Sequence, residues 1–383
     1  MDELKSLRNE IDGIDRQIAD LLQQRMGVTL QVGQYKVRNN MKVLDEDREA
    51  QVLAAKAALS DDPSMQSALI TLFETIMSIS RKQQRQLVQE NDPWYDKYLQ
   101  DLSAVRAPLS NPRVLYQGEQ GAYTEEAAVG FFGEDVRRDR VDTWEEIFVA
   151  LKNGEADYGV LPIENSSTGS INQVYDLLAR YGAHIVGEQT VKVEHCLMAP
   201  KGATLDTIAH VYSHEQGLSQ CTEYLKEHPH WERQSMLNTA IAAKYVAQSN
   251  DVTRAAIGSR RAAALYGLDV LAQRINFNDS NYTRFVVVSP VMELRDGADK
   301  ISGLFTLPHK SGTLHRIMTV FAVAGLNMMK LESRPMVGKN WEYLFFVDFS
   351  GHLTDPGMDA VIRELTQTAS GFRLLGNYKA YEE

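Results

Sequence analysis

The sequence is poor in cysteine and contains no long apolar run. Two cysteines, Cys196 and Cys221, stand among its 383 residues, which excludes a disulfide framework. No apolar stretch is long enough to span a bilayer. The start, MDELKSLRNE, lacks the basic and apolar regions of a signal peptide. These absences predict a cytoplasmic protein that does not contact a membrane.

Acidic residues also outnumber basic residues. Lys+Arg number 40 against 51 Asp+Glu, which gives a formal net charge of -11. This balance gives no support for a nucleic-acid-binding surface, so any anionic ligand must be met by local cations. Hydrophobic residues at 44% and charged residues at 24% exclude disorder over the whole chain. At about 150 residues per domain, the length predicts two or three domains.

Residues 1–90 have few strand signals and carry a single proline, Pro63. We predict helices over 4–38 and 45–59, and a third helix that starts at Asp62-Pro63, where Asp can cap and Pro suits the first turn. The first helix carries apolar residues that step by three and four: Leu4, Leu7, Ile11, Ile14, Ile18 and Leu21. A monomer would leave the far half of this helix uncovered. An intertwined all-α dimer is therefore expected.

The rest of the chain differs from residues 1–90 in composition and in its pattern of apolar residues. Residues 91–112 mix polar and aromatic residues with prolines and are predicted to form a linker with some helix. Residues 113–290 alternate between strand and helix patterns, which predicts a two-lobed α/β domain with a cleft. Residues 299–380 follow the order βαββαβ, which is typical of an α+β ferredoxin-like domain. Three domains of three different classes are expected.

Two cations share one face of the first helix. Arg25 and Lys36 lie eleven positions apart, close to three helical turns. Arg8 precedes Arg25 by seventeen positions, which places it about 100° around the helix and about 25 Å along it. Arg8 can therefore join the other two only from an antiparallel partner helix.

Polar residues on the next two helices are also spaced to share faces. Asp45, Arg48 and Glu49 fall at i, i+3 and i+4, whereas Ser80 and Gln84 fall at i and i+4. Together with the cations of the first helix they would suit a small polyanionic ligand that carries a hydroxyl. The alternative from spacing alone is that they are solvated charges on amphipathic helices.

The stretch LRNEIDGIDRQIADLLQQRMGVTLQVGQYK, followed by DEDRE and the Ser80/Gln84 pair, resembles the all-helical chorismate mutase family. The resemblance implies that Lys36 and Gln84 donate to the ether oxygen of chorismate as the catalytic pair. This pericyclic rearrangement needs no nucleophile, only a held conformer and stabilised negative charge. The implied chorismate-binding residues are Arg8, Arg25, Lys36, Asp45, Arg48, Glu49, Ser80 and Gln84.

Four polar motifs stand at predicted strand ends in the central region: GEQGAYTEEAA, PIENSSTGSI, SHEQGLSQC and NYTRF. They supply hydroxyls and amides rather than a metal set or a catalytic triad. The histidines at 184, 195, 210 and 214 lack metal-ligand spacing, so packing or surface roles are expected. Gly118 and Gly121 do not complete a dinucleotide-binding GxGxxG.

In this order, the motifs resemble prephenate dehydratase over residues 113–290, a family with a two-lobed, periplasmic-binding-protein-like fold. The resemblance implies that Thr283 is the catalytic hydroxyl and that prephenate loses carbon dioxide and its ring hydroxyl to give phenylpyruvate. Glu215 stands where many members have proline, which we interpret as a loop change. The implied prephenate-binding residues are Glu164, Asn165, Ser166, Thr168, Ser213, Gln220, Thr283 and Arg284.

The last segment resembles the ACT domain, a small-molecule sensor of amino-acid metabolism. LESRP spans 331–335, and SGTLH at 311–315 departs from the family's pattern at Thr313 and His315. The implied ligand is L-phenylalanine, acting as an allosteric end-product inhibitor. The alternative is a structural dimerisation unit without a ligand. The implied effector residues are Gly312, Thr313, Leu314, Glu332, Ser333, Arg334 and Pro335.

Together these resemblances imply a bifunctional enzyme of phenylalanine biosynthesis that forms a homodimer or a higher homo-oligomer. It would need no metal or cofactor. One alternative is a non-catalytic amino-acid-responsive binding protein, but retention of Lys36, Gln84 and Thr283 counts against it. Another is a mutase fused to prephenate dehydrogenase. That enzyme would need a nucleotide-binding glycine fingerprint, which is missing.

Overall fold

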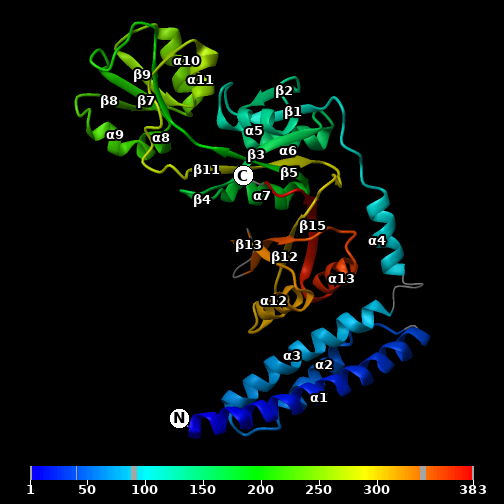
Figure 1. Ribbon diagram of the computed structural model, residues 1–383. Helices are drawn as coiled ribbons and strands as arrows, with labels where there is room; N and C mark the ends of the chain where they lie inside the picture. The colour runs from blue at the N-terminus through cyan, green and yellow to red at the C-terminus, as the bar shows by residue number, and fades with distance from the viewer. Residues whose placement is uncertain (1, 40, 88–92, 337–341, 382–383) are drawn as a thin grey trace. The chain divides into compact units, whose positions relative to one another are not determined.

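The computed structural model describes residues 2–39, 41–87, 93–336 and 342–381. The chain forms two compact units, residues 1–104 with 303–373 and residues 105–302 with 374–383 (Figure 1). In the described part of the chain, no helix is both long and apolar enough to cross a membrane.

The N-terminal segment is all helical, as predicted. Asp45 and Asp62 cap two of its helices, because their carboxylates accept hydrogen bonds from the backbone N–H groups of Arg48 and Ser64. Pro63 occupies the first turn of the third helix. A fourth helix lies in the predicted linker. The elements are α1 (Asp2–Arg38), α2 (Glu46–Ala57), α3 (Pro63–Gln86) and α4 (Pro93–Ser103).

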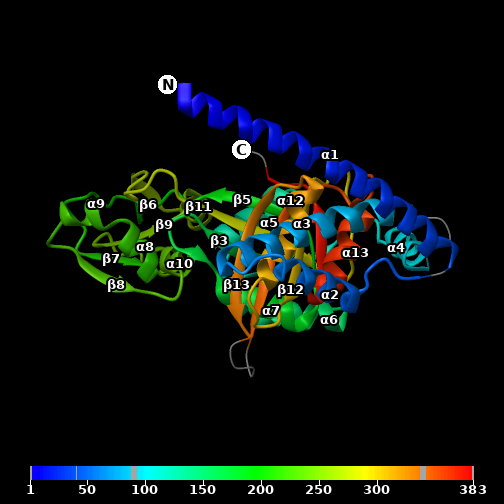
Figure 2. The ribbon, with the colours of Figure 1, turned by 90° about the horizontal axis from the view of Figure 1, so that it is seen from below.

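The apolar seam of α1 is open to solvent in the single chain. Figure 2 shows the N-terminal part of α1 running free of α2 and α3. All six seam side chains are at least half exposed: Leu4, Leu7, Ile11, Ile14, Ile18 and Leu21. An uncovered apolar stripe of this length is unusual for a monomer.

The second unit contains two sheets, and the first has the order β2-β1-β3-β11-β5, with β4 paired to β3. β1 runs parallel to β2 and β3, whereas β11 is antiparallel to both β3 and β5. The strands are β1 (Arg113–Gln117), β2 (Arg137–Val141), β3 (Tyr158–Asn165), β4 (Gly169–Ser170), β5 (His184–Lys192) and β11 (Tyr282–Ser289). The helices that follow in this part are α5 (Tyr123–Phe132), α6 (Trp144–Asn153) and α7 (Asn172–Tyr181).

The second sheet has the order β10-β6-β9-β7-β8. The chain passes between the two sheets twice, from β5 to β6 and back from β10 to β11, which makes the two predicted lobes (Figure 1). The strands are β6 (Cys196–Ala199), β7 (His210–Ser213), β8 (Glu232–Ser235), β9 (Arg254–Gly258) and β10 (Asp269–Ala272). The helices are α8 (Glu215–Gln220), α9 (Thr222–Lys226), α10 (Thr239–Ser249) and α11 (Arg260–Tyr266).

The last segment has the predicted element order, with a sheet ordered β13-β14-β12-β15. Gly325 ends its first helix in the left-handed conformation, at φ 73°, as expected for a C-terminal cap. The predicted turn at 337–340 lies outside the described residues. The elements are β12 (Lys300–Thr306), α12 (Thr313–Ala324), β13 (Met328–Pro335), β14 (Tyr343–Ser350), α13 (Met358–Thr368) and β15 (Ser370–Tyr378).

Candidate functional site

The three N-terminal helices bring part of the predicted chorismate set together. Arg25 Nη1 of α1 donates to Ser80 Oγ of α3 at 2.9 Å. Lys36 Nζ donates to the carbonyl oxygen of Val43, just before α2, at 2.6 Å. Gln84 of α3 is 6% exposed, and its Oε1 is buried with no hydrogen-bond partner in the described chain. Leaving a buried amide oxygen without a hydrogen-bond donor costs free energy.

Gly33 allows α1 to approach α3 at Gln84. A Cβ placed on Gly33 would lie 2.9 Å from Gln84 Cγ and 3.2 Å from Leu87 Cδ1, so a larger residue would force the Gln84 side chain to move. The helical pattern gave no sign of this contact, because an isolated glycine in a helix can have several causes.

Burial and nearby carboxylates shift the pKa values of two cations in the site. Burial lowers the pKa of the Lys36 ammonium, and the carboxylates of Asp45 and Glu49 offset part of that effect. Burial also lowers the pKa of Arg25. The Glu49 carboxylate accepts from the Arg81 guanidinium, which also pairs with Glu364 of α13 at 2.8 Å. Glu49 is therefore held by a residue that the sequence analysis missed.

The other predicted members stand apart. Arg8 is exposed and has no polar partner in the described chain, as expected if its ligand lies on a second copy. Arg48 is exposed as well. Asp45 accepts from the backbone N–H of Arg48 at 3.0 Å, so its carboxylate acts first as the cap of α2.

In the second unit, Asn165 and Thr283 meet because β3 and β11 are paired with these two residues opposite each other. Asn165 Nδ2 lies 2.9 Å from Thr283 Oγ1, 2.8 Å from Asn281 Oδ1 and 3.1 Å from the Tyr282 carbonyl oxygen. Asn281 is 1% exposed. The amide donors of Asn165 are thus used within the protein, and one of them fixes the Thr283 hydroxyl.

The amide oxygen of Asn165 is used as well. It accepts from the backbone N–H groups of Ser167 and Thr168 at 3.0 and 3.1 Å and from Thr168 Oγ1 at 3.2 Å. Ser166 Oγ accepts from the Tyr282 N–H and donates to the Ser280 carbonyl oxygen, at 2.9 Å in both cases. The turn after β3 is therefore tied to the start of β11.

Glu164 and Arg284 lie on the other face of this strand pair. Successive side chains of a strand point to opposite faces, so Arg284 points away from the side that carries Thr283. Arg284 pairs with Glu164 at 3.1 Å and with Glu188 of β5 at 3.3 Å, and Lys300 reaches Glu188 at 2.6 Å. The structure does not bring Glu164 and Arg284 into contact with the Thr283 hydroxyl.

The second lobe supplies Ser213 and Gln220. Ser213 is fully buried, and its hydroxyl donates to the Ile257 carbonyl oxygen at 2.8 Å. Gln220 is 8% exposed, and its Oε1 lies 2.9 Å from Nε2 of His195. Gln216 Nε2 donates to Thr168 Oγ1 at 3.2 Å, which links α8 to the turn after β3. His195 is buried, which agrees with the packing role that we predicted, and its ring also contacts Gln220 and Tyr123.

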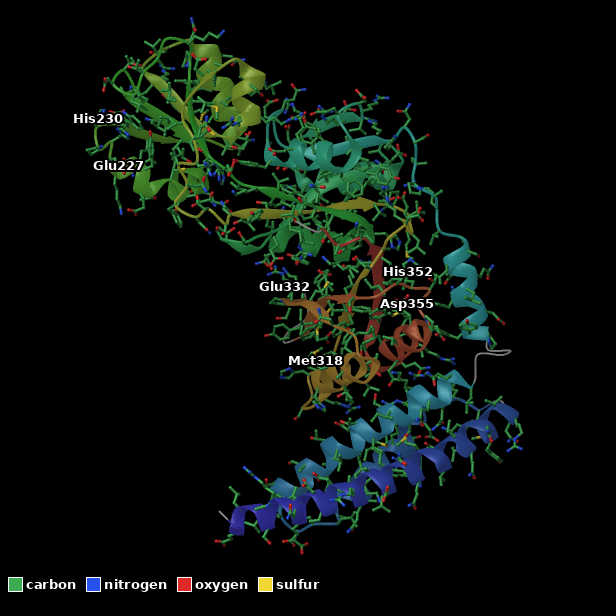
Figure 3. The ribbon with its side chains drawn as sticks, in the orientation of Figure 1. Glu227, His230, Met318, Glu332, His352 and Asp355 are labelled. Carbon is green, nitrogen blue, oxygen red and sulfur yellow. The ribbon has the colours of Figure 1, made fainter. Side chains whose placement is uncertain are left out.

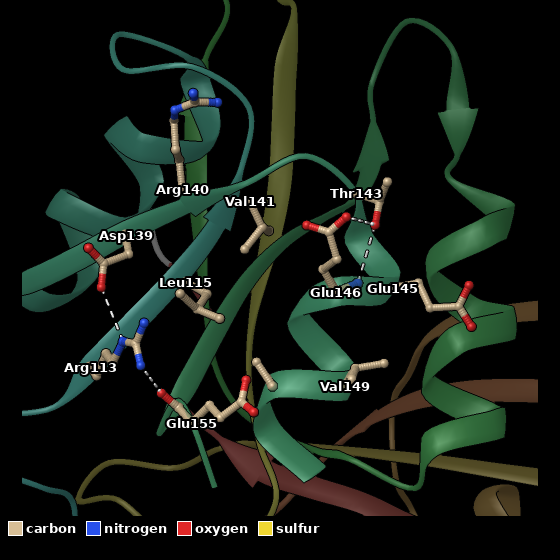
Figure 4. Close-up of a pocket in the computed structure, with 11 residues that line it drawn as sticks. Arg113, Leu115, Asp139, Arg140, Val141, Thr143, Glu145, Glu146, Val149 and Glu155 are labelled. Atoms are coloured by element: carbon tan, nitrogen blue, oxygen red, sulfur yellow. Dashed lines mark hydrogen bonds and ion pairs between the residues drawn. The ribbon is translucent and has the colours of Figure 1, made fainter. Parts of the chain in front are cut away.

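A hollow of about 490 Å³ lies elsewhere in this unit, over β1, β2 and α6 (Figure 4). Some of its polar side chains pair with one another, for example Arg113 with Asp139 at 3.1 Å and Thr143 with Glu146 at 3.0 Å. None of the predicted prephenate residues lines it. No group of three or more His, Cys, Asp or Glu side chains in the described chain is arranged to hold a metal ion.

The predicted effector residues occupy two places in the last segment. Gly312 caps α12 at φ 82°, and Thr313 Oγ1 donates locally, to the Lys310 carbonyl oxygen at 3.0 Å. Leu314 is part of the first turn of α12. Figure 3 marks Glu332 on β13, the strand that also carries Ser333, Arg334 and Pro335. Within the first unit, Thr313 and Glu49 line one cavity of about 560 Å³.

Two family models match the chain, chorismate mutase type II over residues 7–85 and prephenate dehydratase over residues 114–293. A bifunctional chorismate mutase/prephenate dehydratase from Neisseria gonorrhoeae is 33% identical over 372 residues, covering 97% of this chain and 95% of that protein. This chain belongs to the bifunctional chorismate mutase/prephenate dehydratase family. The Escherichia coli K12 protein of that name is 33% identical over 382 residues, covering 98% of this chain and 96% of its own length.

A solved prephenate dehydratase from Arthrobacter aurescens, in complex with L-Phe, is 31% identical at a TM-score of 0.64. The match covers 70% of this chain and 90% of that chain. As a member of the bifunctional family, the chain carries both chorismate mutase and prephenate dehydratase activities of phenylalanine biosynthesis. Gln84 lies within the chorismate mutase match and Thr283 within the prephenate dehydratase match.

Gly33, Arg81 and Asn281 contact members of the two candidate sites, but the sequence did not predict them as site residues. Asn281 had a visible signal, because it is the first residue of the NYTRF motif. Arg81 directly follows Ser80, but nothing in the spacing of α3 pointed to Glu49 as its partner.

Proposed function

We propose that chorismate rearranges to prephenate against Lys36 and Gln84. Negative charge grows on the breaking ether oxygen, and a cationic ammonium at a half-buried position stabilises that charge more than water does. The observation that carries the proposal is that the three N-terminal helices hold a half-buried Lys36 and a buried Gln84, whose amide nitrogen can donate to the same oxygen. Arg25 would hold a carboxylate, and Glu49 with Arg48 would meet the ring hydroxyl, next to Asp45 and Ser80.

We further propose that Arg8 enters this site from a second copy of the chain, so that residues 1–90 form an intertwined homodimer. Two observations support the homodimer: the exposed seam of α1 and the absence of a polar partner for Arg8 in the described chain. A partner helix would bury the seam and bring a guanidinium to the ligand carboxylate at the same time.

Complementation tests this arrangement. Arg8→Ala and Lys36→Ala chains should each be nearly inactive as mutases. Co-expressed, they should recover about a quarter of wild-type activity, because half of the dimers are mixed and each mixed dimer has one intact site. A failure to recover activity in mixed dimers of confirmed composition would place Arg8 and Lys36 in the same chain and contradict the proposal.

For the second reaction, we propose that Thr283 donates the proton to the ring hydroxyl of prephenate, which leaves as water while carbon dioxide departs, and that Thr283 regains its proton from solvent. The hydrogen bond from Asn165 supports this role, because a donor to Oγ1 leaves the hydroxyl hydrogen free for the substrate. Ser166, Thr168 and Gln220 would complete the binding surface. Ser213, with its hydroxyl committed to Ile257, would support α8, and Glu164 and Arg284 would brace the strand pair.

We propose that residues 299–380 form a ferredoxin-like ACT domain that binds L-phenylalanine and inhibits the enzyme. The βαββαβ order and the L-Phe complex described for the Arthrobacter aurescens relative support this assignment. Gly312–Leu314 and Glu332–Pro335 would contact the effector. We also propose that both reactions take place in the cytoplasm.

One experiment tests the whole proposal. Purified protein is incubated with chorismate, without nucleotide, and products are separated over time with and without L-phenylalanine. Phenylpyruvate should appear by way of prephenate and be suppressed by L-phenylalanine. Turnover that is unaffected by millimolar L-phenylalanine would contradict the regulatory assignment alone, whereas accumulation of prephenate would contradict the dehydratase site.

A further inference from the structure

His195 lies in the first of the two connections between the lobes and bonds to residues on both sides. It stands between β5 and β6 and is 2% exposed. Its Nε2 lies 2.9 Å from Gln220 Oε1 in the second lobe, and its Nδ1 lies 3.2 Å from the Tyr123 hydroxyl in the first lobe. Its backbone N–H donates to Asn276 Oδ1, in the returning connection, at 3.0 Å.

These contacts fix the tautomer of the ring. The atom of Gln220 that faces Nε2 of His195 is the amide oxygen, which only accepts, so this contact favours the tautomer with the hydrogen on Nε2. Nδ1 is then an acceptor, and the single hydrogen of the Tyr123 hydroxyl faces two acceptors, the Glu194 carbonyl oxygen at 3.1 Å and Nδ1 at 3.2 Å. Burial lowers the pKa of His195 and so favours the neutral imidazole, and the hydrogen bond to Gln220 offsets part of that effect.

The same contacts fix the direction of the Gln220 side chain. Its backbone carbonyl accepts from the Phe277 N–H at 3.0 Å, and its amide oxygen is held by His195. Gln220 Nε2 has no hydrogen-bond partner in the described part of the chain, so its N–H groups remain available. Helix α8, which ends at Gln220, also touches the turn that carries Thr168.

We propose that His195 is a positioning residue of the dehydratase site, which holds Gln220 Oε1 so that the Gln220 amide N–H groups face a carboxylate or carbonyl oxygen of prephenate. The inference rests on the substrate-binding role proposed for Gln220. An amide that could rotate would present its oxygen half of the time, and an oxygen facing a carboxylate repels it. The histidine therefore removes the unproductive orientation.

The test uses the full chain and prephenate as substrate. His195→Leu keeps an apolar side chain in the buried site but cannot donate, and it should raise the dehydratase KM about tenfold with a smaller fall in kcat. His195→Gln can place a donor near the position of Nε2 and should recover most of the loss, whereas His195→Asn is too short to do so. The mutase rate should remain at the wild-type level in all three variants.

A double variant distinguishes positioning from packing. If His195 acts through Gln220, His195→Leu should add nothing to the defect of Gln220→Ala. His210→Leu serves as a matched control, because His210 is a half-buried histidine of the same lobe that pairs with Glu232. Its KM should be that of the wild type.

Each contrary result has a separate meaning. If Gln220→Ala has a wild-type KM, the role proposed for Gln220 is wrong. If Gln220→Ala is impaired but His195→Leu has a wild-type KM, or if the two defects add, the His195 inference is wrong by itself. Should His195→Leu fail to fold, the comparison of His195→Gln with His195→Asn decides, and equal KM values for these two would overturn the inference.

Discussion

The two catalytic regions differ in how complete they are within one chain. In the helical region, Arg8 has no partner in the described chain, the Gln84 amide oxygen is unsatisfied, and the α1 seam is open to solvent. In the two-lobed region, Asn165 uses both its donors and its acceptor within the protein. The first site is open to completion by another chain, and the second is assembled by pairing of β3 with β11.

This difference follows from how each fold places side chains. A long helix spreads its residues over tens of ångströms, so its two ends cannot meet in one pocket. A strand pair fixes opposite residues within a few ångströms of each other through backbone hydrogen bonds. We therefore expect substitutions in the helical region to affect the mutase activity alone and substitutions in the two-lobed region to affect the dehydratase activity alone.

The largest effect is expected for Lys36→Ala. Removing the ammonium should lower the mutase kcat/KM about 1,000-fold, because the charge on the ether oxygen loses its main stabiliser. Chorismate turnover measures the loss, and dehydration of added prephenate by the same preparation is the control. A mutase rate within tenfold of the wild type would contradict the role of Lys36.

The next effect is expected for Thr283→Ala. Dehydratase kcat should fall about 100-fold, since proton donation to a leaving hydroxyl contributes at this level. Thr283→Ser keeps the hydroxyl and should retain most of the rate, and mutase turnover should be unchanged in both variants. Wild-type turnover of prephenate by Thr283→Ala would show that another group donates the proton.

A smaller effect is expected for Gly33→Ala. The new Cβ would meet Gln84 Cγ at 2.9 Å and displace that side chain, so mutase activity should fall about tenfold. Gly27→Ala is the matched control on the same helix, because nothing lies within 4 Å of its Cβ position. Equal activities for the two variants would mean that the Gln84 side chain tolerates the shift.

The smallest effect is a pH dependence confined to the mutase. Burial lowers the folded-state pKa of Lys36, and its proposed role requires the ammonium form, so mutase activity should be full at neutral pH. It should decline as pH rises through a value below the ordinary pKa of lysine. Lys36→Arg, if it retains measurable activity, should lack this decline. A wild-type mutase profile that stays flat up to the ordinary lysine pKa would contradict the lowered value.

Much of the fold could be predicted from local patterns. Caps at Asp45 and Asp62 and the terminating Gly325 mark helix ends through backbone chemistry, which is readable from sequence. Strand β2, with the sequence RRDRV, cannot be recognised from its sequence, because a charged edge strand has no apolar alternation. The same holds for strand β5, since Gly187 and polar residues interrupt its pattern.

The candidate sites could be predicted in residue type but not in geometry. The resemblances named Asn165 and Thr283, yet strand register was needed to show that Glu164 and Arg284 lie on the opposite face. The partnership of Glu49 with Arg81 depends on how α2 packs on α3, which no local pattern encodes. Long-range contacts of this kind appear only once the elements are assembled.

Successive side chains of β11 face opposite sides of the sheet, so the register of this strand decides which side chain lies in the candidate dehydratase site. Thr283 and Arg284 are neighbours in sequence, but one contacts Asn165 and the other contacts Glu164. Deleting Tyr282 while the chain before it keeps its position would move Arg284 into the place of Thr283 and put a guanidinium where the hydroxyl stands. The first residues of β11 can therefore vary in identity far more easily than in number.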